Sequence, residues 1–76
     1  MHPSIPALLK FFDYDHLPPQ LQEISKLYHD LAHDLAERLG GIEDIGPGAQ
    51  LNRALQKLLE SRDCAVRTAL GLKSDD

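Results

Sequence analysis

The segment Leu51–Gly71, LNRALQKLLESRDCAVRTALG, decides the fold predicted for this chain. Apolar residues recur along it at three- and four-residue steps, which is typical of one long amphipathic helix. They are Leu51, Ala54, Leu55, Leu58, Leu59, Ala65, Val66, Ala69 and, just beyond the segment, Leu72. The same region is basic, with five Lys or Arg residues against two acidic ones from Leu51 to Lys73, although the whole chain has a net charge of −4. This imbalance indicates a helix that meets an anionic partner or ligand.

A second amphipathic stretch precedes this one in the chain. Its apolar stripe consists of Leu21, Ile24, Tyr28, Leu31, Ala32, Leu35 and Leu39. Pro19 suits the first position of a helix, and Gly40 followed by Gly41 is a signal for its end. The loop Gly41–Gln50, GIEDIGPGAQ, has no periodicity. Two amphipathic helices joined by such a loop predict an antiparallel helical hairpin.

The residues before the first long helix predict a short helical arm. Ser4 is expected to cap a helical turn that begins with Ile5 and Pro6. Three aromatic residues follow it, namely Phe11, Phe12 and Tyr14. At least one of these rings is expected to pack onto the hairpin. Another could offer a face on which a nucleobase stacks.

The predicted fold class is therefore all-α, with a short N-terminal helical arm plus an antiparallel helical hairpin in a single domain. The arm covers residues 1–17, the first helix 18–40, the loop 41–50, the second helix 51–72 and a polar tail 73–76. A chain of 76 residues has a small core, and its lone cysteine allows no internal disulfide. The wide apolar stripe of the second helix then predicts assembly into a helical homo-oligomer.

Composition excludes several classes of protein. The acidic balance argues against DNA binding, which needs a basic surface. No targeting or membrane-spanning segment is expected, because the apolar run at residues 7–12 is short and contains Lys10. The lone Cys64 fits a reducing, intracellular compartment and is interpreted as a small residue rather than a nucleophile.

His29 and His33 stand four residues apart within the sequence HDLAH. This spacing places two histidines where both can bind one metal ion, and it resembles the zincin motif HExxH with Asp30 in place of the glutamate. No third ligand is evident beyond Glu37. We therefore interpret both as solvated surface histidines and predict no metal site and no cofactor.

No catalytic residue is predicted. The four serines, Ser4, Ser25, Ser61 and Ser74, have no evident base beside them. The loop between the long helices also lacks the Lys-Ser or Lys-Thr pair that follows a glycine-rich phosphate-binding loop. These absences favour a protein that is not an enzyme.

Lys26 and Arg67 have two interpretations each. Lys26 is expected to form a surface ion pair with Glu23 or Asp30, or else to contact a phosphate. Arg67 is expected to pair with Asp63 one turn earlier, or else to bind a phosphate or stack on a base. Position alone favours the ion pair in both cases.

Arg62 falls in the middle of the apolar stripe of the second helix. A buried guanidinium needs an anionic partner or a route to water. Asp34 and Glu37 on the first helix are candidates for that partner. We therefore expect an ion pair between helices or between subunits, with contact to a ligand as the second possibility.

The run HLPPQLQEISKLYHDLAHDL at residues 16–35, a loop, and ALQKLLESRDCAVRTAL at residues 54–70 carry a resemblance. Together they resemble the small bacteriophage proteins of the anti-CBASS cyclic-nucleotide sponge family, whose hairpin domain is shared with anti-Thoeris sponges. The likeness spans about Phe11–Leu70. Its specific pieces are His16-Leu17-Pro18, Ser25-Lys26, Asp30-Leu31-Ala32, Lys57-Leu58-Leu59-Glu60 with Asp63, and Ala65-Val66-Arg67.

The resemblance implies two ligand sites. The family is a compact helical oligomer, a hexamer, that binds cyclic dinucleotides and, at a separate site, cyclic trinucleotides. In the cyclic-dinucleotide site the family's aromatic residue falls at Phe11 and its phosphate-contacting lysine at Lys26. Phe11 stands where tyrosine is usual, so Tyr14 is expected to supply the missing hydroxyl. The arginine of the cyclic-trinucleotide site falls at Arg67.

The resemblance also implies a function. The expected protein is a non-enzymatic sponge that sequesters cyclic GMP–AMP, cyclic di-AMP and cyclic tri-adenylate in the cytoplasm of an infected bacterial host, and so blocks CBASS anti-phage signalling. Arg62 replaces a lysine of the family and Cys64 an alanine, which leaves ligand preference open. The alternatives are a structural or regulatory helical oligomer that binds another protein and, more distantly, a metal-dependent hydrolase built on His29 and His33.

Overall fold

Helices account for all the regular structure in the described residues, 3–40 and 49–71, of the computed structural model. The elements are α1 (Ser4–Leu9), the 3-10 helix η1 (Lys10–Phe12), α2 (Pro19–Leu39) and α3 (Gln50–Ala69). The all-α prediction is confirmed. The predicted tail, 73–76, and residues 41–48 of the predicted loop lie outside the described residues.

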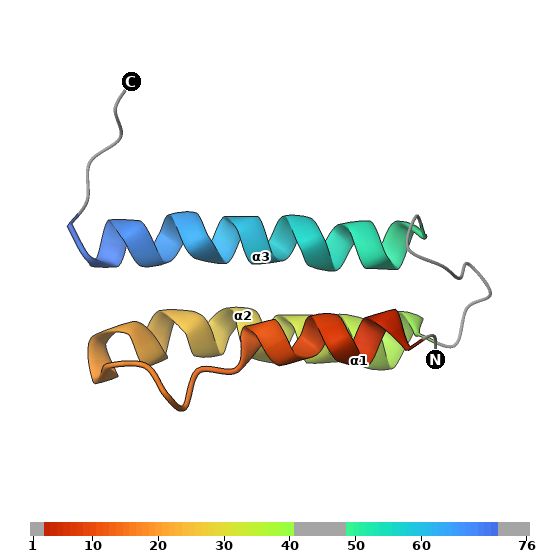
Figure 1. The fold of residues 1–76 in the computed structure, drawn as a ribbon, viewed down its shortest axis with the longest axis horizontal. Coiled ribbons are helices and arrows are strands. Elements are labelled where there is room, and N and C mark those ends of the chain that lie inside the picture. The colour runs from red at the N-terminus through yellow and green to blue at the C-terminus, as the bar shows by residue number, and fades with distance from the viewer. Residues whose placement is uncertain (1–2, 41–48, 72–76) are drawn as a thin grey trace, which may run out of the picture.

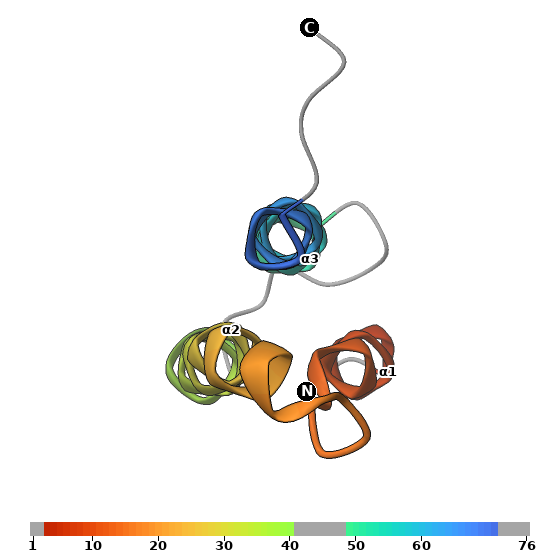
Figure 2. The same ribbon diagram turned by 90° about the vertical axis from the view of Figure 1, so that its left-hand side faces the viewer.

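The helices form two layers (Figures 1 and 2). α2 and α3 pack side by side and run in opposite directions, and α1 lies beside α2 on the same side of α3. Seen end on, the axes of α1, α2 and α3 stand at the corners of a triangle (Figure 2). The predicted arm is thus a third packed helix, because α1 contacts both α2 and α3.

The start of α1 differs from the prediction for Ser4. Pro3 occupies the N-cap position, no side chain caps the helix, and Ser4 is already helical. The Ser4 hydroxyl instead accepts a hydrogen bond from the Asn52 amide of α3, with 2.9 Å between Nδ2 and Oγ. Asn52 is only 3% exposed. The prediction of a cap was wrong because this buried amide, far away in the sequence, takes the Ser4 hydroxyl as its acceptor.

Proline and glycine set the bounds of the long helices. The backbone of Pro18, with ψ 150°, lies outside the helical region. α2 begins at the next residue, Pro19, which occupies its first turn. The predicted second helix, 51–72, is observed as Gln50–Ala69. It ends early because Gly71 adopts a left-handed φ of +76°, which terminates a helix and which a residue with a side chain rarely adopts.

The core lies where side chains of α1, η1, α2 and α3 meet. Its buried members are Ile5, Phe12, Ala32, Ala36 and Leu55. Phe12, Ala32 and Leu55 are each 0% exposed. Burying a phenylalanine side chain stabilises the folded state by about 1.5–3 kcal/mol, so Phe12 is a principal anchor of the arm.

The buried face of α2 is rotated from the predicted stripe. Leu31 and Leu39 belong to that stripe but are 47% and 40% exposed, whereas Ser25 and Ala36 are 0% and 2% exposed. The small residues of α2 face the core because Phe12 fills the space over them, in the same cluster as Ala32 and Ala36.

Candidate functional site

Phe11 and Phe12 are neighbours in η1 with opposite surroundings. Phe12 is fully buried, whereas the Phe11 side chain is 61% exposed. Successive residues of a 3-10 helix point in directions about a third of a turn apart. The burial of Phe12 therefore determines that Phe11 faces outward, where its ring can stack on a flat ligand.

The turn after η1 positions Tyr14. The Leu17 backbone N–H donates to the Tyr14 carbonyl at 3.0 Å. The side-chain amide of Gln22, in the first turns of α2, donates to the Leu17 carbonyl at 2.7 Å and to the Asp15 carbonyl at 3.3 Å. The Tyr14 ring also meets His29 edge-on, with ring centroids 5.1 Å apart. These contacts hold Tyr14 beside the first half of α2.

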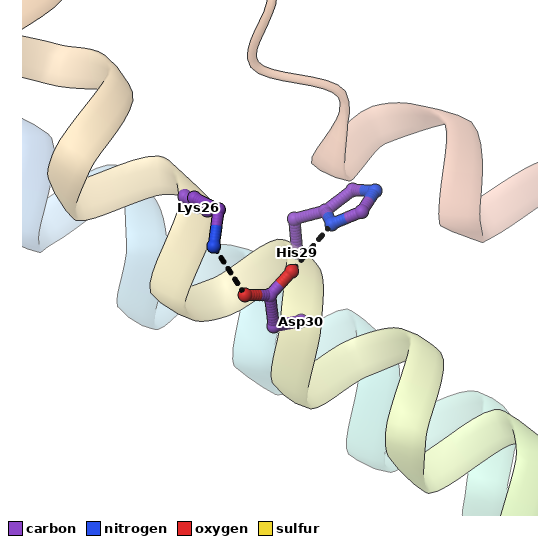
Figure 3. A network of polar contacts seen from close by, with 3 residues as sticks. All are labelled: Lys26, His29 and Asp30. Atoms are coloured by element: carbon purple, nitrogen blue, oxygen red, sulfur yellow. Dashed lines mark hydrogen bonds and ion pairs between the residues drawn. The ribbon is translucent and has the colours of Figure 1, made fainter.

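Lys26 forms an ion pair on the surface of α2. Its Nζ lies 3.0 Å from Oδ2 of Asp30, and Nδ1 of His29 lies 3.0 Å from the other oxygen of that carboxylate (Figure 3). The hydrogen bond to Asp30, supported by its charge, raises the pKa of Lys26. Hydrogen bonds from His29 and then from Lys26 lower the pKa of Asp30. Of the two partners expected for Lys26, the structure uses Asp30.

Tyr14 and Lys26 line one shallow hollow, which we call the Lys26 concavity. Its volume is about 530 Å³, and its other lining residues are Pro19, Gln20, Gln22 and Glu23. Two of the three residues predicted for a cyclic-dinucleotide site therefore lie together. Phe11, the third, does not line this hollow in the single chain.

Phe11 lies instead with Arg67, in what we call the Arg67 groove. This groove, of about 470 Å³, runs between η1 with its following turn and the second half of α3. Its lining includes Lys10, Phe11, Ser25, Arg62, Val66 and Arg67. The resemblance assigns Phe11 and Arg67 to different ligands, yet both residues line the same groove within a single chain.

Arg62 finds a different partner from the one expected. It is 19% exposed, and its guanidinium lies 2.9 Å from the Asp63 carboxylate. It also donates to the Phe11 carbonyl and stands 5.9 Å from the centre of the Phe12 ring. The expected Asp34 pairs with Arg38 instead, at 3.0 Å. Arg62 turns toward η1 because the arm packs against α3 and covers that side of the helix.

Ser25 is a site residue that the sequence analysis did not predict. Its side chain is 0% exposed, its hydroxyl oxygen has no hydrogen-bond partner, and it lines the Arg67 groove. The available signal was a polar residue one turn after Leu21, on the face of α2 that turns out to be buried. A buried hydroxyl normally has a partner, so this one marks an unusual position.

The two histidines of HDLAH lie side by side. The ring centroids of His29 and His33 are 4.2 Å apart, and His29 bonds to Asp30 rather than standing free in solvent. Among residues 3–40 and 49–71, no group of three or more His, Cys, Asp or Glu side chains is arranged to hold a metal ion. The predicted absence of a metal site stays a prediction.

Comparison of the chain with protein-family models, curated proteins and solved structures finds no match. No helix within the described part of the chain is long and apolar enough to cross a membrane. The side chains that line the Lys26 concavity and the Arg67 groove are therefore the observations that bear on function.

Proposed function

We propose that this protein is a non-enzymatic sponge for cyclic di- and trinucleotides, which it sequesters from the effectors of CBASS immunity. The observation that carries the proposal is the exposed Phe11 ring, 61% accessible, in a groove that also contains Arg67. A stacking face beside a guanidinium matches the two parts of a nucleotide, its base and its phosphate.

Cyclic dinucleotides are assigned to Phe11, Tyr14 and Lys26. Tyr14 and Lys26 already line one concavity, so a phosphate at Lys26 would lie near the Tyr14 hydroxyl. The ammonium group of Lys26 has three donors and bonds to Asp30 through a single contact, which leaves donors for a phosphate. A Phe11 ring from a second chain would complete the site, because a two-fold axis brings equivalent groups together.

Cyclic trinucleotides are assigned to Arg67. Arg67 is exposed, and Asp63, its expected partner, bonds to Arg62 instead. A guanidinium suits a phosphate diester because its parallel N–H groups can donate to two oxygens. Sequestration of this kind needs abundant, tight binding and no turnover, so it requires neither a general base nor a metal ion.

Assembly into a homo-oligomer, a hexamer by resemblance, belongs to the same proposal. Leu27 and Leu31 on α2 are 67% and 47% exposed, and Leu70 at the end of α3 is 51% exposed. Apolar side chains of this size at the surface of a small domain favour burial against further copies. The assembly is proposed to act in the cytoplasm of the infected bacterial host.

Titration calorimetry of the full-length protein with cyclic GMP–AMP, cyclic di-AMP and cyclic tri-adenylate tests this proposal. We expect heat of binding with a dinucleotide and with the trinucleotide, and recovery of intact nucleotide after heat denaturation of the complex. The absence of heat with all three ligands at micromolar protein contradicts the sponge, and a linearised product contradicts the assignment as a non-enzyme.

The second candidate is a structural or regulatory helical oligomer that binds another protein. The exposed pair Leu27 and Leu31, one helical turn apart on α2, favours it. A stable oligomer in native mass spectrometry that gives no calorimetric heat with any of the three nucleotides would favour this candidate over the sponge.

A further inference from the structure

An unpaired hydroxyl lies in the wall of the Arg67 groove. Ser25 is fully buried, its Oγ makes no hydrogen bond, and it lines the groove from α2. Leaving a buried hydroxyl without a partner destabilises the folded protein. A ligand oxygen that reached this hydroxyl would remove that cost, which would favour the liganded state of the groove over the empty one.

Arg62 places a second guanidinium in the same groove. The Phe11 carbonyl, the Asp63 carboxylate and the face of the Phe12 ring hold it in place. A guanidinium has five donors, and these contacts use only part of them. Because Arg62 is largely immobilised before a ligand arrives, it loses little conformational entropy when it binds a phosphate.

The charges of the groove favour an anion with a flat apolar part. Lys10, Arg62 and Arg67 are cationic, whereas Asp13 and Asp63 are anionic, so the groove carries a net positive charge within an acidic chain. Leu17, Val66 and the Phe11 ring supply the apolar surface. The volume of the groove, about 470 Å³, lies within the range of small-molecule binding sites.

We propose that the Arg67 groove is a nucleotide subsite in which Arg62 is a second phosphate-binding arginine and the Ser25 hydroxyl donates a hydrogen bond to the ligand. This inference rests on the proposed function and names two binding residues that the resemblance does not assign. Phe11 also lines this groove, so its ring is proposed to contact cyclic tri-adenylate in addition to the cyclic dinucleotide assigned to it above.

Ser25→Ala separates a ligand contact from a structural role. The substitution removes an unpaired hydroxyl, so the melting temperature should stay equal or rise by up to about 4–8 °C. Affinity for cyclic tri-adenylate, measured by calorimetry, should nevertheless fall about three- to tenfold. An unchanged affinity in a folded Ser25→Ala variant overturns the role of Ser25.

Arg62→Gln and Arg62→Lys test the second arginine. Arg62→Gln should weaken cyclic tri-adenylate about ten- to a hundredfold. Arg62→Lys keeps the charge but loses the fork of donors, so it should restore only part of the affinity. Arg53→Gln is the matched control, because Arg53 is exposed on α3 and does not line the groove. Circular dichroism checks that each variant is folded.

The outcomes distinguish this inference from the proposed function. Wild-type protein that binds none of cyclic tri-adenylate, cyclic GMP–AMP and cyclic di-AMP overturns both. If wild-type protein binds cyclic tri-adenylate, and folded Arg62→Gln and Ser25→Ala variants bind it as tightly as the Arg53→Gln control, the subsite alone is overturned and the sponge stays in place.

Discussion

The Lys26 concavity and the Arg67 groove present their cations differently. Lys26 is exposed on α2 and bonds to Asp30, so a phosphate there competes with a carboxylate within the same helix. Arg62 in the groove is only 19% exposed and is held by groups from η1 and α3. The comparison teaches that packing between elements prearranges the groove, whereas one helix by itself forms the ion pair of the concavity.

Removing the support common to both sites should have the largest effect. Phe12→Ala deletes a fully buried ring of the core and should lower the free energy of unfolding by about 3–5 kcal/mol. Chemical denaturation measures this loss. Phe11→Ala is the matched control: it should change stability by less than about 0.5 kcal/mol, because that ring is largely exposed. Equal losses of unfolding free energy in the two variants would contradict the assignment of Phe12 as buried and Phe11 as exposed.

Arg67→Ala, in the Arg67 groove, should weaken binding of the cyclic trinucleotide selectively. Loss of a charged hydrogen-bond donor to phosphate should weaken cyclic tri-adenylate about ten- to a hundredfold. Binding of cyclic GMP–AMP should be unchanged within error, because Arg67 does not line the Lys26 concavity. Calorimetry with both ligands measures the difference, and Arg53→Ala serves as the control. A parallel loss of both ligands in a folded variant would mean that the sites are not separate.

Lys26→Ala should give the opposite selectivity with a smaller change. Cyclic GMP–AMP should weaken about three- to tenfold while cyclic tri-adenylate is unaffected. The change is smaller than that at Arg67 because Lys26 must exchange Asp30 for the phosphate. Lys57→Ala is the control, since Lys57 is exposed on α3 and lines neither site. A loss confined to cyclic tri-adenylate would reverse the assignment.

The smallest effect concerns the titration of Asp30. Its lowered pKa means that the carboxylate contributes stability above the ordinary aspartate value of about 3.9, and that this contribution is lost as pH falls through the lower folded value. The raised pKa of Lys26 acts at the other end: its contribution is complete below about 10.4 and is lost as pH rises through the folded value.

Carbon NMR of the Asp30 carboxyl group checks this titration. The midpoint should lie below about 3.9, and both His29→Ala and Lys26→Ala should raise it, because each removes a hydrogen bond to the carboxylate. A midpoint at or above the ordinary value would show that the contacts of Figure 3 do not persist in solution.

Sequence periodicity predicted the helices but not the rotation of α2. The predicted stripe included Leu31, whereas the buried face contains Ser25 and Ala36. Periodicity reports which residues are apolar, and it cannot report that Phe12 packs in one cluster with the small residues Ala32 and Ala36 of α2. For the same reason Ser25 was not predicted as a site residue.

Local pairs were easier to predict than long-range ones. Lys26 with Asp30 follows from the four-residue spacing that places two side chains together on one helix face. The carbonyl acceptor of Arg62 comes from Phe11, about fifty residues away in the chain, and no local rule identifies it. Phe11 and Arg67 were predicted as separate site residues, and their common groove depends on the same long-range packing.

By itself, the sequence determined the all-α class, the start of α2 near Pro19 and an ion pair of Lys26 with an acidic residue one turn away on α2. These properties depend on residues within a few positions of one another, where helix geometry sets the distances. Tertiary structure alone decided which of Phe11 and Phe12 is buried, which carboxylate neutralises Arg62, and that Ser25 faces a groove without a partner. Those outcomes depend on how η1 packs against α2 and how Arg62 of α3 contacts η1, which joins residues that no spacing in the sequence relates.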